Sequence, residues 1–179
     1  MARRWLVFMV LLAGMGVAAW FVTRAPREAG EGPPPEDSVD TGFKTARVFF
    51  ASPGGDSLVV ETREQIETTN FHDRVASLVE ELDRGPRGRG LRTIPAGTTV
   101  LHAYIDDRGL LTLDVSAAFR DGFHGGAAAE YLAIASLART LTANIPEVKR
   151  LMLVCGGQPL PTLAGHLPLD RPIEPAEWP

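Results

Sequence analysis

The feature that most constrains this chain is an uninterrupted apolar run near its amino terminus. Residues 5–22 read WLVFMVLLAGMGVAAWFV and contain no charged residue and no proline. A run of this length can cross a hydrocarbon core of about 30 Å as a helix. Arg3 and Arg4 precede it, and the positive-inside rule places that end in the cytoplasm. We therefore expect a cytoplasmic stub (residues 1–4), one transmembrane anchor in the inner or cytoplasmic membrane (residues 5–22) and an extracytoplasmic remainder.

A cleaved signal peptide is the competing interpretation of the same run. Val17, Ala18 and Ala19 could form a small-residue cleavage site. The run is nevertheless longer than the usual signal-peptide core of about 7 to 15 residues, and it continues through Trp20 and Phe21. We expect the segment to be retained as an anchor. No cysteine follows the run, so a lipid-attachment site is not predicted there.

The next segment, residues 23–43, is rich in Pro, Gly and acidic residues and has few large apolar side chains. Such a composition cannot offset the entropy of ordering, so a disordered linker is predicted. We expect one domain over residues 44–169 and a Pro-rich tail over residues 170–179. Beyond residue 27 the chain carries 14 basic and 22 acidic residues. This acidic balance argues against a nucleic-acid partner, which is bound by neutralising its phosphates.

Within the domain, the apolar pattern changes between strand and helix periods. Strands are predicted at residues 44–51, 57–63, 98–105, 110–115 and 148–155, and helices from the N-cap Asn70 to Arg84 and over 127–145. Each helix is expected to have one apolar stripe, and the last strand is expected to be covered on both faces. The order β-β-α-β-β-α-β favours an α+β two-layer sandwich, with both helices on one face of a mixed or antiparallel sheet.

Short segments in this order resemble the GerMN domain family of sporulation and spore-germination proteins. The resemblance spans residues 46–169 and rests on Arg84-Gly85-Pro86, Gly90-Leu91, residues 94–98 (IPAGT), residues 113–116 (LDVS) with Phe119, residues 133–137 (AIASL) with Thr140-Leu141, and Gly165-His166. It implies a membrane anchor followed by a domain outside the membrane, similar to ring-building modules of envelope and secretion assemblies. It implies no catalytic residues. The namesake has two copies of the domain, whereas one copy is found in this sequence.

The residues themselves favour no catalytic, cofactor or metal site. The four histidines (His72, His102, His124 and His166) are scattered, with none at a metal-binding spacing. Ser116 or Ser136 could combine with Asp114 and His124, but no nucleophile-elbow pattern surrounds either serine. The single cysteine, Cys155, lies in an apolar stretch and is expected to be a buried hydrophobe. An envelope hydrolase or a substrate-binding accessory subunit acting on peptidoglycan stays open as the alternative function.

One loop concentrates positive charge on this acidic domain and is the candidate interaction site. It contains Arg84, Arg87, Arg89 and Arg92, whose guanidinium groups suit carboxylates and phosphates. Its glycines are equally typical of a flexible solvated loop. We expect a non-enzymatic, membrane-tethered binding or assembly module whose partner is an envelope protein or another copy of the chain, with no small-molecule ligand. An exposed sheet edge is a second place where such a partner could bind.

Overall fold

The computed structural model describes residues 43–174. The predicted stub, the predicted anchor, nearly all of the linker and the end of the tail lie outside these residues. Within them, no helix combines the length and the apolar character needed to span a bilayer.

Two antiparallel strands form the first part of the fold. They are β1 (Phe43–Ala51) and β2 (Leu58–Ile66), paired without a break from Phe43 opposite Ile66 to Ala51 opposite Leu58. The turn between them is closed by Ser52, whose hydroxyl donates to the Asp56 carboxylate at 2.7 Å. The predicted hairpin is confirmed, and β2 runs three residues further than the pattern indicated.

The first long helix, α2 (Phe71–Arg84), begins where the sequence predicted. The side chain of Asn70 accepts a hydrogen bond from the N–H of Asp73 at 3.2 Å, which satisfies one of the free donors of the first turn. The helix ends at Gly85, whose φ of 83° lies in a region that favours glycine. Its apolar stripe is buried as expected, and the acidic side chain of Glu81 is buried as well. Glu81 tolerates burial because it is paired with arginines.

The larger sheet contains four strands in the order β3-β4-β5-β6. They are β3 (Val100–Ile105), β4 (Leu110–Val115), β5 (Arg150–Cys155) and the short β6 (Gln158–Pro159). The β4–β5 pair is parallel and the other two pairs are antiparallel, so the sheet is mixed. The short helix α3 (Ala118–Asp121) and the long helix α4 (Ala127–Asn144) make the crossover that a parallel pair requires.

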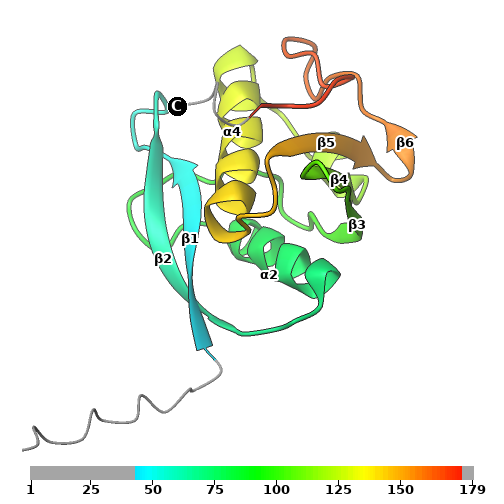
Figure 1. The fold of residues 1–179 in the computed structure, drawn as a ribbon. Coiled ribbons are helices and arrows are strands. Elements are labelled where there is room, and N and C mark those ends of the chain that lie inside the picture. Colours follow the sequence, from blue (N-terminus) through cyan, green and yellow to red (C-terminus); the bar gives the residue numbers. More distant parts are fainter. Residues whose placement is uncertain (1–42, 175–179) are drawn as a thin grey trace, which may run out of the picture. The chain divides into compact units, whose positions relative to one another are not determined.

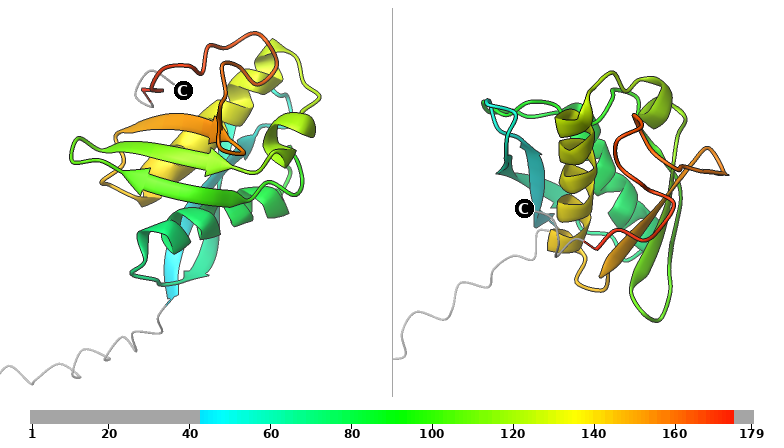
Figure 2. Two further views of the ribbon diagram at one scale, coloured as in Figure 1. Left: turned by 90° about the vertical axis from the view of Figure 1, so that its right-hand side faces the viewer. Right: turned by 90° about the horizontal axis from the view of Figure 1, so that it is seen from above.

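The helices lie between the two sheets. Figure 1 shows α4 flanked by the β1–β2 hairpin on one side and by β5 on the other, and the view from above in Figure 2 shows the same layering. The predicted α+β class, the element order and the helices on one face of a mixed sheet are confirmed. The strands are divided between two sheets, however, and the hairpin covers the helices from the opposite side.

This layering explains two predictions that were wrong. The helix α4 is buried almost all round, since Leu132, Leu137 and Thr140 are as inaccessible as the expected stripe of Ile134, Ala138 and Leu141. A helix that is covered on opposite sides needs apolar residues around most of its circumference. The strand β5 was expected to be covered on both faces. Its residues alternate between buried and half-buried, which shows that only one face is fully covered.

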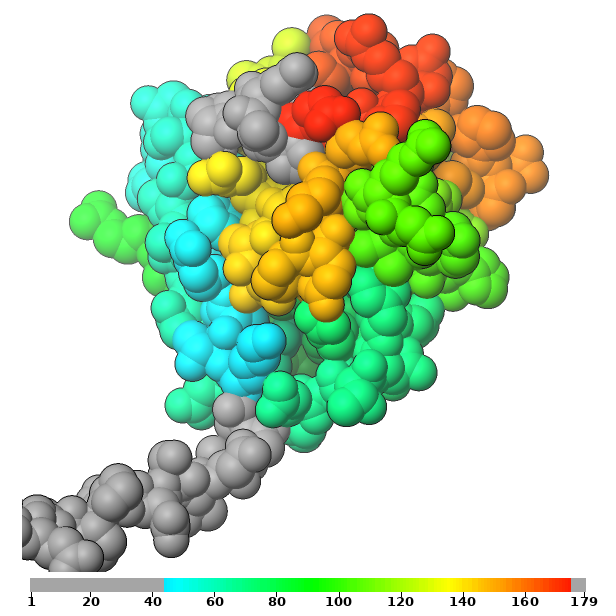
Figure 3. Space-filling model, in the orientation of Figure 1, coloured from blue at the N-terminus to red at the C-terminus, as the bar shows by residue number. Residues whose placement is uncertain are grey.

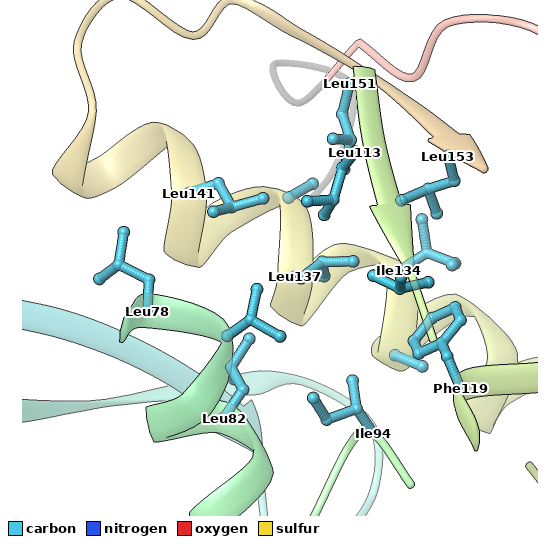
Figure 4. Packing of buried hydrophobic residues seen from close by; sticks show 14 of the residues in the cluster. Leu78, Leu82, Ile94, Leu113, Phe119, Ile134, Leu137, Leu141, Leu151 and Leu153 are labelled. Carbon is cyan, nitrogen blue, oxygen red and sulfur yellow. The ribbon is translucent and has the colours of Figure 1, made fainter. Parts of the chain in front are cut away.

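The hydrophobic core packs α4 against α2 and against the strands of the larger sheet. Figure 4 shows Ile134, Leu137 and Leu141 of α4 between α2 and the strands of the larger sheet. Leu113 of β4 and Leu151 of β5 lie in the same cluster and have no exposed surface. The hairpin is therefore held against a rigid helix, with one edge facing α4 and the other facing away.

Candidate interaction edge

Side chains of α4 occupy the outer edge of β1. The Asn144 side chain accepts from the N–H of Arg47 at 2.9 Å and donates to its carbonyl at 2.7 Å. One turn earlier, the Thr140 hydroxyl accepts from the N–H of Phe49 at 3.1 Å. Another turn earlier, the Ser136 hydroxyl donates to the Phe49 carbonyl at 2.6 Å. The helix thus supplies the hydrogen bonds that a third strand would otherwise make.

The end of the same edge is closed by backbone contacts. The N–H of Ala51 donates to the carbonyl of Leu91 at 3.2 Å, and the reverse bond measures 2.8 Å. Between Leu91 and α4, the hydroxyl of Thr93 contacts the hydroxyl of Ser136 at 2.6 Å. The outward N–H and C=O groups of β1 from Arg47 to Ala51 are therefore all paired.

The opposite edge of the hairpin, formed by β2, is open. In an antiparallel pair, facing residues either bond to each other or both direct their backbone groups outward. Because Arg47 and Phe49 bond to α4, their facing residues Thr62 and Val60 must direct their N–H and C=O groups away from β1. Among the described residues, no hydrogen-bond partner reaches these groups.

The side chains along this edge suit a strand partner. Val60 is 50% exposed and Ile66 is 75% exposed, and Thr62 between them is also exposed. The β2 strand is nine residues long and its pairing has no bulge. Long, unprotected edges of this kind template pairing with another chain. We call the outward backbone groups and side chains of residues 58–66 the β2 edge.

In the larger sheet, part of the β5 edge is paired, and the β3 edge carries the exposed side chains of Leu101 and Tyr104. The β5 strand pairs with β6 at Val154 and Cys155, and Leu151 exchanges two backbone bonds with Ile173. At the other side of that sheet, α2 packs beside β3, as the left view in Figure 2 shows.

Two of the four arginines of the predicted loop, Arg84 and Arg92, are exposed but hold the end of α2. Arg84 pairs with Glu80 at 2.6 Å and with Glu81 at 2.5 Å. Arg92 donates to the last carbonyls of α2, those of Asp83 and Arg84, and so caps its C-terminus. Adding a Cβ at Gly85 would bring it to 2.9 Å from the Arg92 guanidinium. These two arginines therefore stabilise the helix end and are not available as a preformed ligand site.

The other two arginines are exposed and lie on a segment that is fastened to β2. The Glu61 carboxylate accepts from the N–H of Arg87 at 3.0 Å and from that of Gly88 at 2.9 Å. Burial alone would raise the pKa of Glu61. These N–H groups and Arg63 outweigh that effect, so the pKa lies below its usual value and the carboxylate stays charged. The Arg87 side chain is 67% exposed, and Arg89 is also exposed. The structure thus brings half of the predicted loop close to the β2 edge.

A buried ion-pair network supports this attachment. Arg63 is 3% exposed and contacts Glu61 at 2.6 Å and Glu81 at 3.2 Å. The second contact is out of line for a hydrogen bond. The Arg63 guanidinium also donates to the carbonyl of Gly85 at 3.3 Å. Breaking such a network by removing one partner leaves a buried charge unpaired, which is strongly destabilising.

A second buried carboxylate, Glu130 in the first turn of α4, holds the segment after β6. Its oxygens accept from the Thr162 hydroxyl at 2.8 Å, from the N–H groups of Leu163, Ala164 and His166 at 3.0 Å each, and from His166 Nδ1 at 3.0 Å. Burial raises the pKa of Glu130, but these donors outweigh it and bring the pKa to about 2. His166 therefore helps to hold this segment, with Glu130 as its partner.

The polar side chains that were considered from sequence as a catalytic combination bond to separate parts of the fold. Ser136 bonds to Phe49 and Thr93, the Ser116 hydroxyl donates to the Gly97 carbonyl, and the Asp114 carboxylate accepts from the N–H of Gly157. Cys155 is buried, and burial raises the pKa of its thiol. Within residues 43–174, no group of three or more His, Cys, Asp or Glu side chains is placed to hold a metal ion.

Two cavities open at opposite ends of the hairpin. One of about 360 Å³ lies beside Lys44, Ile66 and Arg74. The other, of about 430 Å³, lies beside Leu91, Pro95 and Phe123, and includes His124. Neither cavity collects several titratable groups with shifted pKa values, the feature that is typical of active sites.

Two groups of residues were missed by reasoning from sequence. Ser136, Thr140 and Asn144 recur every four residues, so they form one polar stripe along a mostly apolar helix. That spacing was the available signal for a covered strand edge. Glu130 had a weaker signal, an acidic residue in the first turn of an apolar helix.

Comparisons with known proteins place the fold. Residues 47–161 match the family described as Germane: Sporulation and spore germination. The tandem GerMN domains of the sporulation protein GerM from Bacillus subtilis match with a TM-score of 0.60 and 19% identity, covering 75% of this chain and 47% of that one. The first GerMN domain alone matches with a TM-score of 0.55 and 18% identity, covering 73% and 97%. The predicted resemblance is confirmed.

A third structure, described as a “Putative Lipoprotein from Clostridium perfringens”, matches with a TM-score of 0.54 and 16% identity. That match covers 76% of this chain and 90% of the other. No curated protein matches the chain. At these identities the solved structures show a common fold.

Proposed function

This chain belongs to the Germane family, and on that premise we propose that it is a non-enzymatic binding or assembly module of the bacterial cell envelope. The module acts by accepting an extended strand of a partner protein along the β2 edge. One observation carries this proposal: α4 and Leu91 satisfy the outer backbone groups of β1, while those of Val60 and Thr62 face outward without a partner among the described residues.

The open edge requires a polypeptide partner. An added strand lies about 4.8 Å from its neighbour and supplies both N–H donors and C=O acceptors at the spacing of the ladder. A lipid head group or an anionic polymer cannot supply that alternation. The exposed β-branched side chains of Val60 and Thr62 add cross-strand contacts that favour such a pairing.

The module is tethered outside the cytoplasm in this proposal. Residues 5–22 form the anchor, and residues 23–43 form the linker that lets the domain reach its partner. The similar protein from Clostridium perfringens is described as a lipoprotein, which is another way to hold such a domain at a membrane. In this chain the single cysteine, Cys155, is buried in β5, so an apolar helix is the available tether.

Site-specific photo-crosslinking in native membranes tests the binding mode. A photoreactive residue replaces Thr62 on the β2 edge or, as the control, Asp107 in the exposed turn between β3 and β4. Crosslinking to a discrete polypeptide is expected at position 62 and not at position 107. The reason is that only the first position lies along the added strand.

A backbone substitution provides the second arm. With the photoreactive residue moved to position 64, Thr62→Pro should remove the crosslink, because it deletes an outward N–H while leaving the β1–β2 ladder intact. Thr62→Val keeps the N–H and should keep the crosslink. Equal crosslinking from positions 62 and 107, or an unchanged product in Thr62→Pro, would overturn strand addition. Circular dichroism of each variant verifies that the hairpin domain is folded.

A further inference from the structure

We propose that the strand accepted by the β2 edge is acidic, an extended polypeptide segment rich in Asp or Glu. This inference rests on the proposed function and identifies the chemistry of the partner. It follows from the charges on the two faces of the hairpin beside Val60 and Thr62, because the side chains of an added strand would alternate between those faces.

The outer face of the hairpin carries an exposed arginine beside this edge. Arg47 faces Thr62 across the strand pair, and its guanidinium lies 5.5 Å from the centre of the Phe49 ring. Arg139 of α4 stacks on the same ring at 5.7 Å, further from β2. No described carboxylate makes an ion pair with either guanidinium. Acidic side chains of an added strand that point to this face would meet Arg47 first.

The inner face of the hairpin lies beside two more exposed arginines, Arg87 and Arg89. The backbone of Arg87 and Gly88 is bonded to Glu61, so the segment with Arg87 and Arg89 is held against β2. Figure 3 shows part of this green segment projecting beside the cyan hairpin. The Arg87 guanidinium is 3.8 Å from the buried Glu81, a long contact that leaves most of its donors free. Acidic side chains that point to this face would meet Arg87 and Arg89.

The carboxylates of the neighbourhood are largely committed elsewhere. Glu61 and Glu81 share the buried Arg63, and Glu80 pairs with Arg84. Glu64 is exposed and lies opposite Thr45, two residues along β2 from Thr62 and on the same face. Beside Val60 and Thr62, the exposed arginines Arg47, Arg87 and Arg89 outnumber this one exposed carboxylate, on a chain whose formal net charge is −4. Such complementarity selects acidic partners over basic ones.

Direct binding to synthetic strands tests this inference. The full chain in neutral detergent micelles is titrated with inorganic polyphosphate and with blocked nine-residue peptides in which pairs of Asp, Asn or Lys residues alternate with pairs of valines, so that both faces of the added strand carry the test residue. We expect the Asp peptide to bind about tenfold more tightly than the Asn peptide at 50 mM salt, a gain of the size that a few exposed ion pairs supply. Raising the salt to 500 mM should remove most of that difference, because the screening length shortens.

Charge variants with a matched control assign the effect to the arginines beside the edge. Arg87→Gln combined with Arg89→Gln should reduce the preference for the Asp peptide at least several-fold. The control pair, Arg108→Gln with Arg171→Gln, removes two exposed arginines elsewhere in the domain and should leave that preference unchanged. An equal loss in both pairs would mean that net charge alone is responsible, and the inference would be overturned.

The outcomes separate this inference from the proposed function. If the Asp and Asn peptides bind equally and Thr62→Pro abolishes both, strand addition stands and the acidic preference is wrong. Tighter binding of the Lys peptide than of the Asp peptide would also show that the acidic preference is wrong. If polyphosphate competes with the Asp peptide and Thr62→Pro binds both normally, the surface is a simple anion patch and both proposals fail. If no peptide binds, strand addition itself is refuted.

Discussion

Neutralising the buried carboxylate of Glu130 should destabilise the domain by about 3 kcal/mol. The pKa of this group falls from 4.5 to about 2 in the folded chain, and each pKa unit corresponds to about 1.4 kcal/mol. The Glu130→Gln variant keeps the shape but loses the charge. Its amide N–H₂ also meets the N–H of His166, so that two donors face each other.

The pH dependence of the free energy of unfolding measures the same stabilisation by the Glu130 carboxylate in the unmodified chain. A carboxylate whose folded pKa is depressed contributes its full stabilisation above its unfolded pKa, here about 4.5, and loses it as the pH falls through the folded pKa of about 2. The free energy of unfolding should therefore fall by about 3 kcal/mol more in the wild type than in Glu130→Gln between pH 5 and pH 2. Other carboxylates contribute to both proteins and cancel in the comparison.

Urea unfolding of residues 43–179, followed by circular dichroism at 222 nm, measures both effects. The control is Glu67→Gln, which removes an exposed carboxylate and should change stability by less than about 0.5 kcal/mol. If the free energies of unfolding of Glu130→Gln and the control differ by less than about 0.5 kcal/mol at pH 7, the reasoning is refuted. Parallel pH profiles for Glu130→Gln and the wild type would refute it independently, because they would show that the carboxylate is not stabilised by the fold.

Three further predictions concern the core, the domain and the anchor. Leu141→Asp should lower the free energy of unfolding by several kcal/mol, because Leu141 has no exposed surface. Arg139→Glu should not, because Arg139 is only half-buried, and equal thermal midpoints of the two variants would contradict this. Residues 43–179 expressed without the anchor should unfold cooperatively as a soluble α+β domain, and a disordered circular-dichroism spectrum would show otherwise. The protein purified from membranes should retain residues 5–22, so an intact mass lacking the first nineteen residues would establish a cleaved signal peptide.

The local elements of this fold could be predicted because their signals are local. Asn70 caps α2 through a bond to a residue three positions away, and the Asp106 carboxylate closes the β3–β4 turn by accepting from the N–H groups of Arg108 and Leu110. Such contacts depend on spacings that a sequence displays directly. The apolar periods likewise indicated the strands and helices, and the order of these elements indicated the α+β fold.

The partners of each face could not be predicted in the same way. The prediction of a single stripe on α4 failed because periodicity reports which side is apolar and does not show that a second sheet covers the polar stripe. The bonds from Ser136 to Phe49 and from Asn144 to Arg47 join residues 87 and 97 positions apart. The predicted loop was divided similarly, since Arg84 and Arg92 bond to the end of a helix, whereas Arg87 and Arg89 lie on a segment that is bonded to β2.

By itself, the sequence determined the apolar run at residues 5–22, the acidic balance, the order of the elements and the family to which they belong. The tertiary structure decided which strand edge is open. An edge is open or closed according to what packs beside it, and α4 covers β1 through contacts between residues about 90 positions apart. Among residues 43–174, the outward backbone groups of Val60 and Thr62 are left without a partner as a consequence, because a helix that covers one side of a two-stranded hairpin leaves its other side uncovered.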